Sequence, residues 1–387
     1  MVNRYIVRDL ENAIRRLSNK YPIITVLGPR QSGKTTLLKQ LFPDHHYVTL
    51  EAPDVRIAIQ NDPRGFLNEY KRDPLIIDEF QRFPDLTSYL QEYADEYYDM
   101  GQLLLTGSQQ YQIGESVSQS LAGRTAILKL LPLSLGEIAR QYPPDNLEDT
   151  LFRGSYPAVF DRQLEPLDWY PSYVETYLER DVRQLLQIGN LDRFVLFLKI
   201  LAGRAGQLLN LNNLGREVGI SQPTARQWLS ILQASQLVFT LKPLHRNVNQ
   251  RMLKTPKLYF SDTGLLCYLL GIQAPGDLPK HPQGGAIFEN FVISEFEKFK
   301  YAVRPLSLLF FRDKLGREVD LIIEQGEKLD LFEIKYSHTI KEDHYRHMKY
   351  IAGHTSIESM SVIYMSDQRL PKVTGWKKLR KIEQLIS

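Results

Sequence analysis

The chain lacks the features that mark secreted and membrane proteins. It has a single cysteine, Cys267, among 387 residues, so no disulfide can form within it, which suits a reducing compartment. No stretch approaches the roughly 20 apolar residues that a membrane-spanning helix needs, and no apolar signal segment follows the basic start. We therefore expect a cytoplasmic protein with no membrane partner, in which Cys267 packs in a core.

An excess of charge of one sign is also missing. The 48 lysines and arginines against 45 aspartates and glutamates leave a net charge of +3, which is too small to indicate a nucleic-acid partner by itself. Internal repeats and low-complexity tracts are absent as well. A hydrophobic content of 43% and a charged content of 24% are ordinary for a globular protein. The length predicts two or three domains, each able to bury its own core.

The most informative segment that is present is a glycine-rich loop at residues 28–35. It reads G-x-x-x-x-G-K-T, directly after an apolar run at 23–27 and before a helical pattern. Strand, glycine loop and helix start are the context of a phosphate-binding loop, whose backbone N–H groups close around a phosphate. Lys34 would reach the β- and γ-phosphates, and the Thr35 hydroxyl would bind Mg²⁺. The residues predicted to bind the nucleoside triphosphate are Gly28, Pro29, Arg30, Gln31, Ser32, Gly33, Lys34, Thr35 and Thr36.

Two further apolar runs supply the rest of a nucleotide site. The run at 74–79 ends in Asp78, oriented to Mg²⁺ through water, and Glu79, placed to polarise the attacking water. The run at 102–108 ends in polar residues, and Thr106 or Ser108 would contact the γ-phosphate or the water, unless the strand simply ends in a turn there. Alternating strands and helices predict a parallel, doubly wound sheet with nucleotide at the carboxyl ends of the strands.

An arginine follows this region in the segment 118–124. Arg124 stands after Gly123 and could complete the site of a neighbouring subunit as an arginine finger. The competing interpretation is an arginine that is merely solvated.

The middle of the chain is predicted to be helical, with a helix-turn-helix in its second half. Residues 141–192 read as a helical lid or connector. Helices at 211–218 and 222–233 flank a glycine turn and precede a strand-like run, the order of a winged helix-turn-helix. The second helix would present Gln222, Thr224 and Arg226 to DNA. A basic cluster that follows favours phosphate contact: His245, Arg246, Arg251, Lys254 and Lys257. A protein-docking module or a solvated wing would look the same.

Near the C-terminus the pattern indicates a second metal site. Glu289 lies on a helix predicted at 286–299, Asp320 opens an apolar strand, and Glu333 and Lys335 share one face of the next strand. This D…E-x-K set is the arrangement of nucleases with the restriction-endonuclease-like fold. The three carboxylates would hold Mg²⁺ while Lys335 stabilises charge on the phosphate. Whether the site cleaves, or survives as an inert nucleic-acid-binding fold, stays open.

Taken together, the motifs resemble a bacterial and archaeal family of AAA+-type ATPases whose C-terminal domain has long been catalogued as of unknown function. The resemblance rests on GPRQSGKTTLL, LIIDEF, LLLTGS and SLAGR in the first half, and on LAGRAGQLLN, KTPKLYFSDTGLL, GREVDLII and FEIKYS in the second. It implies ATP with Mg²⁺, a homo-oligomer such as a hexameric ring, and action on DNA, with branched or junction DNA as one substrate class.

The expected fold is an α/β multidomain protein in four parts. These are a doubly wound P-loop ATPase core at 1–140, the helical connector at 141–192, a winged-helix segment at 193–280 and a restriction-endonuclease-like α/β domain at 281–387. The first functional hypothesis is an ATP-hydrolysing protein that acts on DNA. The alternative is a nucleotide-switched regulator or defence effector, which binds DNA or a protein and whose nuclease-like fold is inert.

Overall fold

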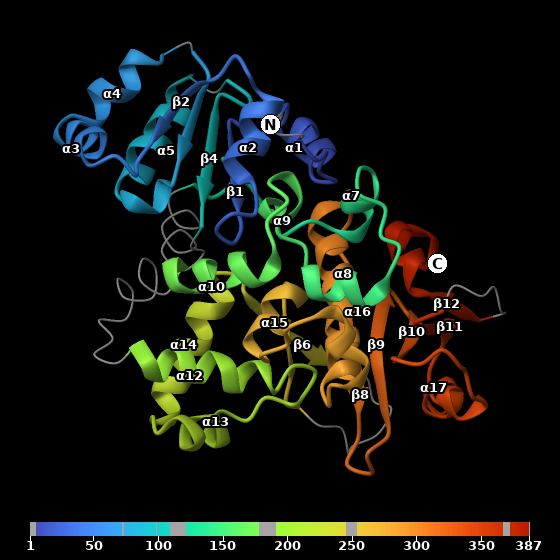
Figure 1. The fold of residues 1–387 in the computed structure, drawn as a ribbon. Helices are drawn as coiled ribbons and strands as arrows, with labels where there is room; N and C mark the ends of the chain where they lie inside the picture. Colours follow the sequence, from blue (N-terminus) through green and yellow to red (C-terminus); the bar gives the residue numbers. More distant parts are fainter. Residues whose placement is uncertain are drawn as a thin grey trace.

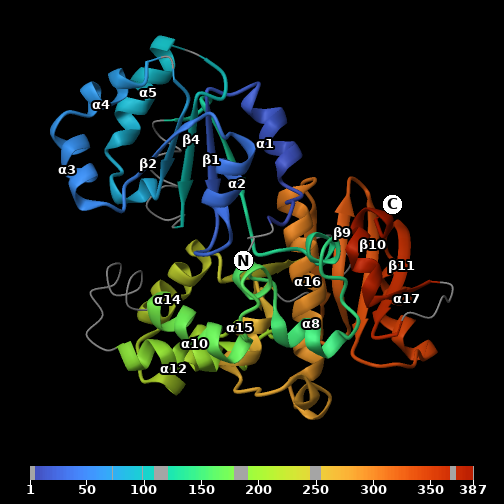
Figure 2. The ribbon, with the colours of Figure 1, turned by 45° about the horizontal axis from the view of Figure 1, so that its top comes forward.

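The computed structural model describes residues 5–71, 73–97, 99–108, 121–177, 191–244, 254–366 and 372–386. They form an N-terminal layered α/β body and a larger body around a second sheet, seen from two directions in Figures 1 and 2. Within these ranges no helix is long and apolar enough to cross a membrane.

The N-terminal body is built on a five-stranded parallel sheet with the strand order β2-β3-β4-β1-β5. Its strands are β1 (Ile23–Leu27), β2 (His46–Thr49), β3 (Leu75–Asp78), β4 (Leu103–Gly107) and β5 (Thr125–Lys129). The helices between and before them are α1 (Glu11–Ser18), α2 (Lys34–Leu41), α3 (Pro53–Asn61), α4 (Pro63–Glu69), the 3₁₀ turn η1 (Phe80–Arg82) and α5 (Leu86–Tyr97).

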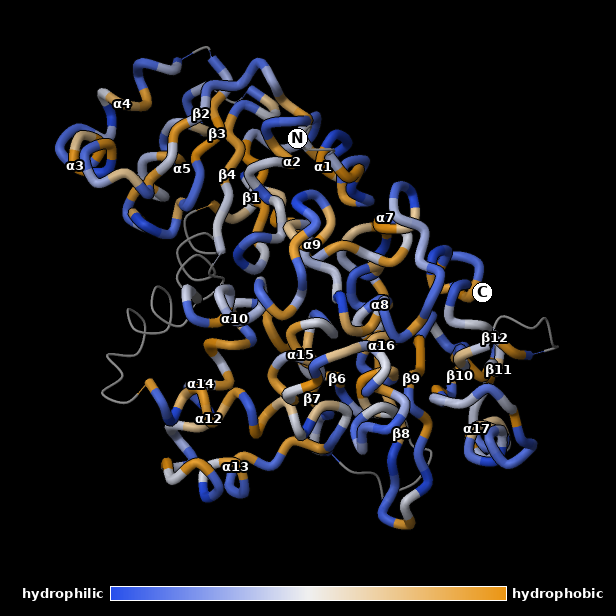
Figure 3. The backbone as a smooth tube through the Cα atoms, in the orientation of Figure 1, coloured by the Kyte–Doolittle hydropathy of each residue, from blue (hydrophilic) through white to orange (hydrophobic). Residues whose placement is uncertain are grey.

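Helices cover both faces of this sheet, because its central strands are apolar on both sides. Alternate residues of β1 belong to different cores: Ile24 packs with Leu37 of α2, whereas Ile23 packs in the core that contains Leu90 of α5. Figure 3 shows hydrophobic residues along the inner strands and hydrophilic ones along the outer loops. The predicted parallel, doubly wound sheet is confirmed, and the carboxyl ends of its strands form one edge where a nucleotide site can be built.

The second body is organised around a seven-stranded mixed sheet with the order β12-β11-β10-β9-β8-β6-β7. The strands β8, β9 and β10 form an antiparallel meander, while β10 pairs in parallel with β11. The strand bounds are β6 (Val238–Pro243), β7 (Lys257–Phe260), β8 (Ser307–Arg312), β9 (Glu318–Gln325), β10 (Lys328–Lys335), β11 (Ile357–Tyr364) and β12 (Val373–Gly375).

Helices surround this sheet, and the longest, α16 (Gly284–Ala302), packs against β7 and β10. The others are α7 (Leu135–Ala139), α8 (Leu147–Arg153), α9 (Pro157–Asp161), α10 (Pro166–Tyr177), α12 (Leu191–Ala202), α13 (Leu211–Val218), α14 (Gln222–Ala234), α15 (Thr263–Leu269) and α17 (Arg346–Ala352). The 3₁₀ segments are η3 (Pro275–Lys280), η4 (Glu342–Tyr345) and η5 (Trp376–Gln384).

One hydrophobic core runs through the second body. It contains Leu151 of α8, Phe197 of α12, Cys267 of α15 and Phe332 of β10, so the expected burial of the cysteine is confirmed. Strand β6, from the predicted winged-helix segment, pairs with β8, from the predicted C-terminal domain, so one sheet spans the predicted boundary at 280. The division at 193 and 281 stays a prediction, and the shared sheet and core argue against independent folding of those parts.

Candidate functional site

The glycine-rich loop lies at the carboxyl end of β1 and leads into α2, as predicted. Two of its residues, Gln31 and Gly33, have positive φ angles of 59° and 92°, a backbone region that glycine enters without cost. Gly28 has no room for a side chain, because a Cβ there would lie 2.1 Å from the carbonyl oxygen of Leu130. The loop is therefore a tight turn whose shape depends on both glycines.

Polar groups inside the loop are poised for a ligand with many oxygen atoms. The Lys34 ammonium, 5% exposed, donates to the carbonyls of Gly28 and Pro29 at 3.0 and 2.8 Å. The Ser32 hydroxyl is buried and has no hydrogen-bond partner, which is costly unless a bound group satisfies it. The buried lysine, the orphaned hydroxyl and the glycine turn fit a phosphate group.

Asp78 is the centre of the acidic side of the site. Its Oδ1 accepts a hydrogen bond from the Thr35 hydroxyl at 2.8 Å and another from Thr106. Its Oδ2 accepts one from Tyr47 at 2.8 Å, and burial, helped by this contact, raises the pKa of the tyrosine. Thr35 and Asp78 are thus brought together from α2 and β3 although β4 lies between β3 and β1. This oxygen pair fits Mg²⁺ bound together with phosphate.

Glu79 follows Asp78 with a φ of 54° and turns its side chain toward β4. Its carboxylate accepts hydrogen bonds from Gln81 and, at 3.3 Å, from Ser108, while Gln81 also donates to Ser108 at 2.9 Å. The two predicted residues Glu79 and Ser108 therefore lie together at the strand ends. The arrangement holds the carboxylate at the edge of the sheet where the loop lies.

Arg124 does not belong to this site within its own chain. It precedes β5, whose Thr125 pairs with Ile23 at the start of β1, about 13 Å from Leu27 at the loop end. Its guanidinium binds Asp95 of α5 through two contacts at 2.5 and 2.7 Å. A role of Arg124 in the site of a neighbouring subunit stays a prediction.

The helix pair at 211–234 matches the sequence interpretation closely. Gly219 ends α13 in the left-handed conformation, and the Ser221 side chain caps α14 by accepting from the Thr224 N–H at 3.2 Å. Gln222 and Arg226 are exposed, whereas Trp228 is buried. The hairpin of β6 and β7 follows. Arg246 and Arg251 lie outside the described residues, as does His245.

The four residues of the predicted nuclease-like site come together at the junction of α16, β9 and β10. Lys335 contacts Glu333 at 2.6 Å and Asp320 at 3.7 Å, and Asp320 also accepts from the backbone N–H of Ile334 at 2.8 Å. A fifth residue, which the sequence analysis assigned to the basic cluster after the helix pair, joins these four. Lys257 of β7, expected to face phosphate, is 1% exposed and binds Glu289 at 2.9 Å.

Every carboxylate of this cluster is paired with a lysine. Lys257 also pairs with Glu318, and Tyr259 donates to Glu289 at 2.7 Å. Burial opposes the charged form of Lys257, but Glu289, Asp320 and Glu318 together raise its pKa. Burial, helped by Asp320, raises the pKa of Glu333 to about 8. The lysines thus remain charged, and Glu333 favours the neutral form at neutral pH.

This geometry does not fit the predicted Mg²⁺ site of Glu289, Asp320 and Glu333. Each of the three carboxylates is already paired with an ammonium group: Glu289 with that of Lys257, and Asp320 and Glu333 with that of Lys335. Among the residues that the structure describes, no group of three or more His, Cys, Asp or Glu side chains could hold a metal ion. The buried lysine of β7 supplies positive charge beside Glu289, which a buried carboxylate needs.

Three sequence families match successive parts of the chain. Residues 20–139 match the family described as AAA domain. Residues 144–276 match Domain of unknown function (DUF8612), and residues 284–382 match Domain of unknown function (DUF4143). Together with the glycine loop and the parallel sheet, the first match supports an AAA-type P-loop ATPase core.

Two curated relatives are the uncharacterized proteins Rv2008c of Mycobacterium tuberculosis and Mb2031c of Mycobacterium bovis. Each is 30% identical to this chain, and the match covers 94% of this chain and 81% of the relative. The chain belongs to their family. Because these members are themselves uncharacterized, membership does not assign an activity to the second body.

Among solved structures, one match is the Walker-type ATPase paby2304 of Pyrococcus abyssi, with 16% sequence identity and a TM-score of 0.46. The match covers 67% of this chain and 94% of that one. Another is domain III of the replication initiation protein DnaA of Thermotoga maritima, at 19% identity and a TM-score of 0.27, covering 58% and 93%.

Sequence reasoning missed several residues of both sites. Tyr47 reaches Asp78 from the edge strand β2, and Gln81 holds Glu79 from the turn after β3. Tyr259 and Lys257 reach Glu289 from β7. A lysine in an otherwise apolar strand, K-L-Y-F, was the available signal for a buried ion pair, since such a lysine is costly to bury without a carboxylate.

The raised pKa of Glu333 predicts how stability depends on pH. The pKa of Glu333 rises from 4.5 to about 8 on folding. Between these pH values the folded state holds a proton that the unfolded state has released, so the folded protein loses stability as pH rises through this window. Glu333→Gln removes this loss. Urea unfolding should show the variant gaining on the parent between pH 5 and pH 8, by up to about 1.4 kcal/mol for each pH unit. A difference that is the same at both pH values would contradict the raised pKa.

Proposed function

We propose that the chain is a Mg²⁺-dependent ATP hydrolase that binds DNA as a homo-oligomer. The observation that best supports the hydrolase assignment is the hydrogen bond of 2.8 Å that Thr35 donates to Asp78. It joins the end of the glycine loop to the acidic strand end, the pair that P-loop ATPases use for the metal. The choice of ATP and of an oligomer follows the sequence resemblance, and Arg124 is the candidate for completing a neighbour's site.

The residues of the site divide the work as follows. The backbone of the loop and the Lys34 ammonium would bind phosphate oxygens. Thr35 and Asp78 would hold Mg²⁺, which would supply positive charge to offset that of the phosphates. Glu79 takes the proton of the attacking water. Gln81 and Ser108, which donate to the Glu79 carboxylate, keep it oriented.

The assignment predicts two different phenotypes at Lys34 and Glu79. Lys34→Ala should abolish ATP turnover because the phosphates lose their cation. Glu79→Gln should keep ATP binding but lower the turnover rate by at least about 100-fold, since an amide cannot accept the proton. Steady-state phosphate release and binding of a fluorescent ATP analogue measure both. Glu92→Gln, an exposed change on α5, is the control, and turnover by Lys34→Ala at the parent rate would refute the assignment.

DNA binding through α14 is supported by the polar face of that helix. Its apolar side is buried, so Gln222 and Arg226 are presented outward after a capped helix start, the end that such helices place in a groove. Thr224 is half-buried and its hydroxyl lies 2.8 Å from that of Ser221. It therefore supports the helix start more than it faces a partner.

Arg226→Gln is expected to weaken DNA binding about fivefold and to reduce the slope of log affinity against log salt concentration by about 1. Arg216→Gln on α13 is the matched control, because that guanidinium is bonded to Asn213. Fluorescence anisotropy with linear, forked and four-way DNA at several salt concentrations gives both quantities. Equal binding by the parent and Arg226→Gln would exclude α14 from the interface.

The lysine-paired cluster supports the second hypothesis for the C-terminal part, a nuclease-like fold that does not cut. With Lys257 and Lys335 paired with the carboxylates, no metal-dependent cleavage step is proposed. The chain is then an ATP-driven DNA-binding protein rather than a nuclease.

Incubation of linear, single-stranded and four-way DNA with Mg²⁺ or Mn²⁺ should give no cleavage by the parent beyond that of Asp320→Ala. The expected result follows from the pairing of the carboxylates with lysines. Product formed by the parent and lost in Asp320→Ala would restore the nuclease, whatever the ATPase assay shows.

A further inference from the structure

A buried arginine from the segment before α1 reaches the glycine loop. Arg8 is 6% exposed. Its Nη1 donates to the carbonyl of Ser32 at 2.7 Å, and its Nη2 donates to the carbonyl of Leu131 at 2.7 Å. Nη1 also lies 3.7 Å from the position that a Cβ on Gly33 would take. One side chain thus bridges the loop and the segment after β5.

The contact with Ser32 fixes a peptide group in the middle of the loop. The carbonyl of Ser32 and the N–H of Gly33 belong to one planar trans peptide, so they point in opposite directions. A donor that holds the carbonyl outward turns the N–H of Gly33 away from Arg8. Backbone N–H groups at this point of a glycine loop are the ones that cradle phosphate.

Glu137 holds Arg8 in this position. It is 2% exposed and lies 3.1 Å from Arg8 Nε. The same carboxylate accepts from the N–H of Asp9 at 2.6 Å and from that of Ser134 at 2.8 Å. The charge of the arginine is therefore paired where it is buried, and hydrogen bonds from two of its nitrogens hold the planar group.

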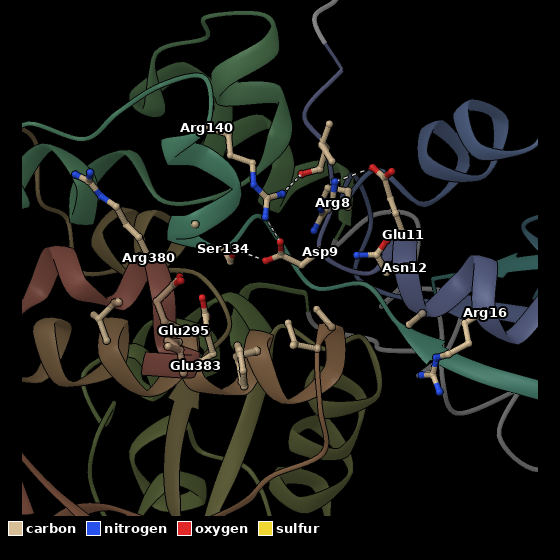
Figure 4. Close-up of a pocket in the computed structure, with 18 residues that line it drawn as sticks. Arg8, Asp9, Glu11, Asn12, Arg16, Ser134, Arg140, Glu295, Arg380 and Glu383 are labelled. Atoms are coloured by element: carbon tan, nitrogen blue, oxygen red, sulfur yellow. Dashed lines mark hydrogen bonds and ion pairs between the residues drawn. The ribbon is translucent and has the colours of Figure 1, made fainter. Parts of the chain in front are cut away.

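The polar contacts around Arg8 and Glu137 continue into the second body. The N–H of Leu135, the first residue of α7, donates to Glu295 of α16 at 2.7 Å. Glu295 pairs with Lys298, also at 2.7 Å. Figure 4 shows Arg8, Asp9 and Arg140 on one side of a cavity of about 550 Å³, with Glu295 on another. The glycine loop is thus connected through buried polar contacts to the longest helix of the other body.

We infer that Arg8 is a positioning residue for nucleotide binding, which keeps the Ser32–Gly33 peptide in the orientation that receives phosphate. This role rests on the proposed ATPase function and adds a residue from outside the glycine motif to its site. Arg8 acts through the loop backbone and takes no part in the chemical step.

The test compares Arg8→Gln and Arg8→Lys with Arg140→Gln in the full-length protein. Arg140 is the matched control, because it binds Asp9 and the carbonyl of Val7 but makes no contact with the loop. Arg8→Gln should weaken binding of a fluorescent ATP analogue about tenfold, the effect of losing hydrogen bonds from a charged donor. KM for ATP should rise in parallel while kcat changes less than about threefold, because the lost interaction acts on binding.

Arg8→Lys should fall between the parent and Arg8→Gln, since a single ammonium cannot hold both carbonyls in a fixed fork. Unchanged affinity and KM in Arg8→Gln would overturn the inference. So would an equal loss in Arg140→Gln accompanied by a lowered melting temperature, which would indicate general destabilisation. If the parent protein neither binds nor hydrolyses ATP, the proposed function fails first, and that result is distinct from either outcome.

Discussion

The nucleotide site depends on the hydrogen bonds that Asp78 accepts from three hydroxyl groups. Thr35, Thr106 and Tyr47 come from α2, β4 and β2, so one carboxylate gathers most of the sheet around the glycine loop. Asp78 is 7% exposed, so its oxygens depend on these donors. Loss of Tyr47, which donates to Oδ2, would leave a buried oxygen without a hydrogen bond, which costs more than the bond itself contributes. The loop therefore sits on a scaffold that stays organised without a ligand.

The two bodies solve the problem of buried charge in different ways. In the N-terminal body, hydroxyl groups neutralise a carboxylate only partly, which leaves room for a cation. In the second body, Lys257 and Lys335 pair with carboxylates from α16, β9 and β10. The same kinds of residues thus produce one site suited to Mg²⁺ and another that has its positive charge built in.

The junction between the bodies includes buried polar contacts near the loop. Arg8, Glu137 and Glu295 are each buried and paired, so a change at the glycine loop cannot occur without adjustment of α7. Buried ion pairs and hydrogen bonds of fixed geometry favour discrete arrangements over continuous ones.

The sequence by itself determined the local elements: the strand, loop and helix around Lys34, the acids at the end of β3, the helix pair at 211–234 and the two strands that carry Asp320 and Glu333. These follow from periodicity, capping residues and glycine positions, which act over a few residues. Only the tertiary structure decided which charges meet. Lys257 contacts Glu289, 32 positions away; Arg8 contacts Ser32, 24 positions away; and Arg124 contacts Asp95, 29 positions away. No local pattern encodes such pairings, because they depend on how the sheets and helices pack.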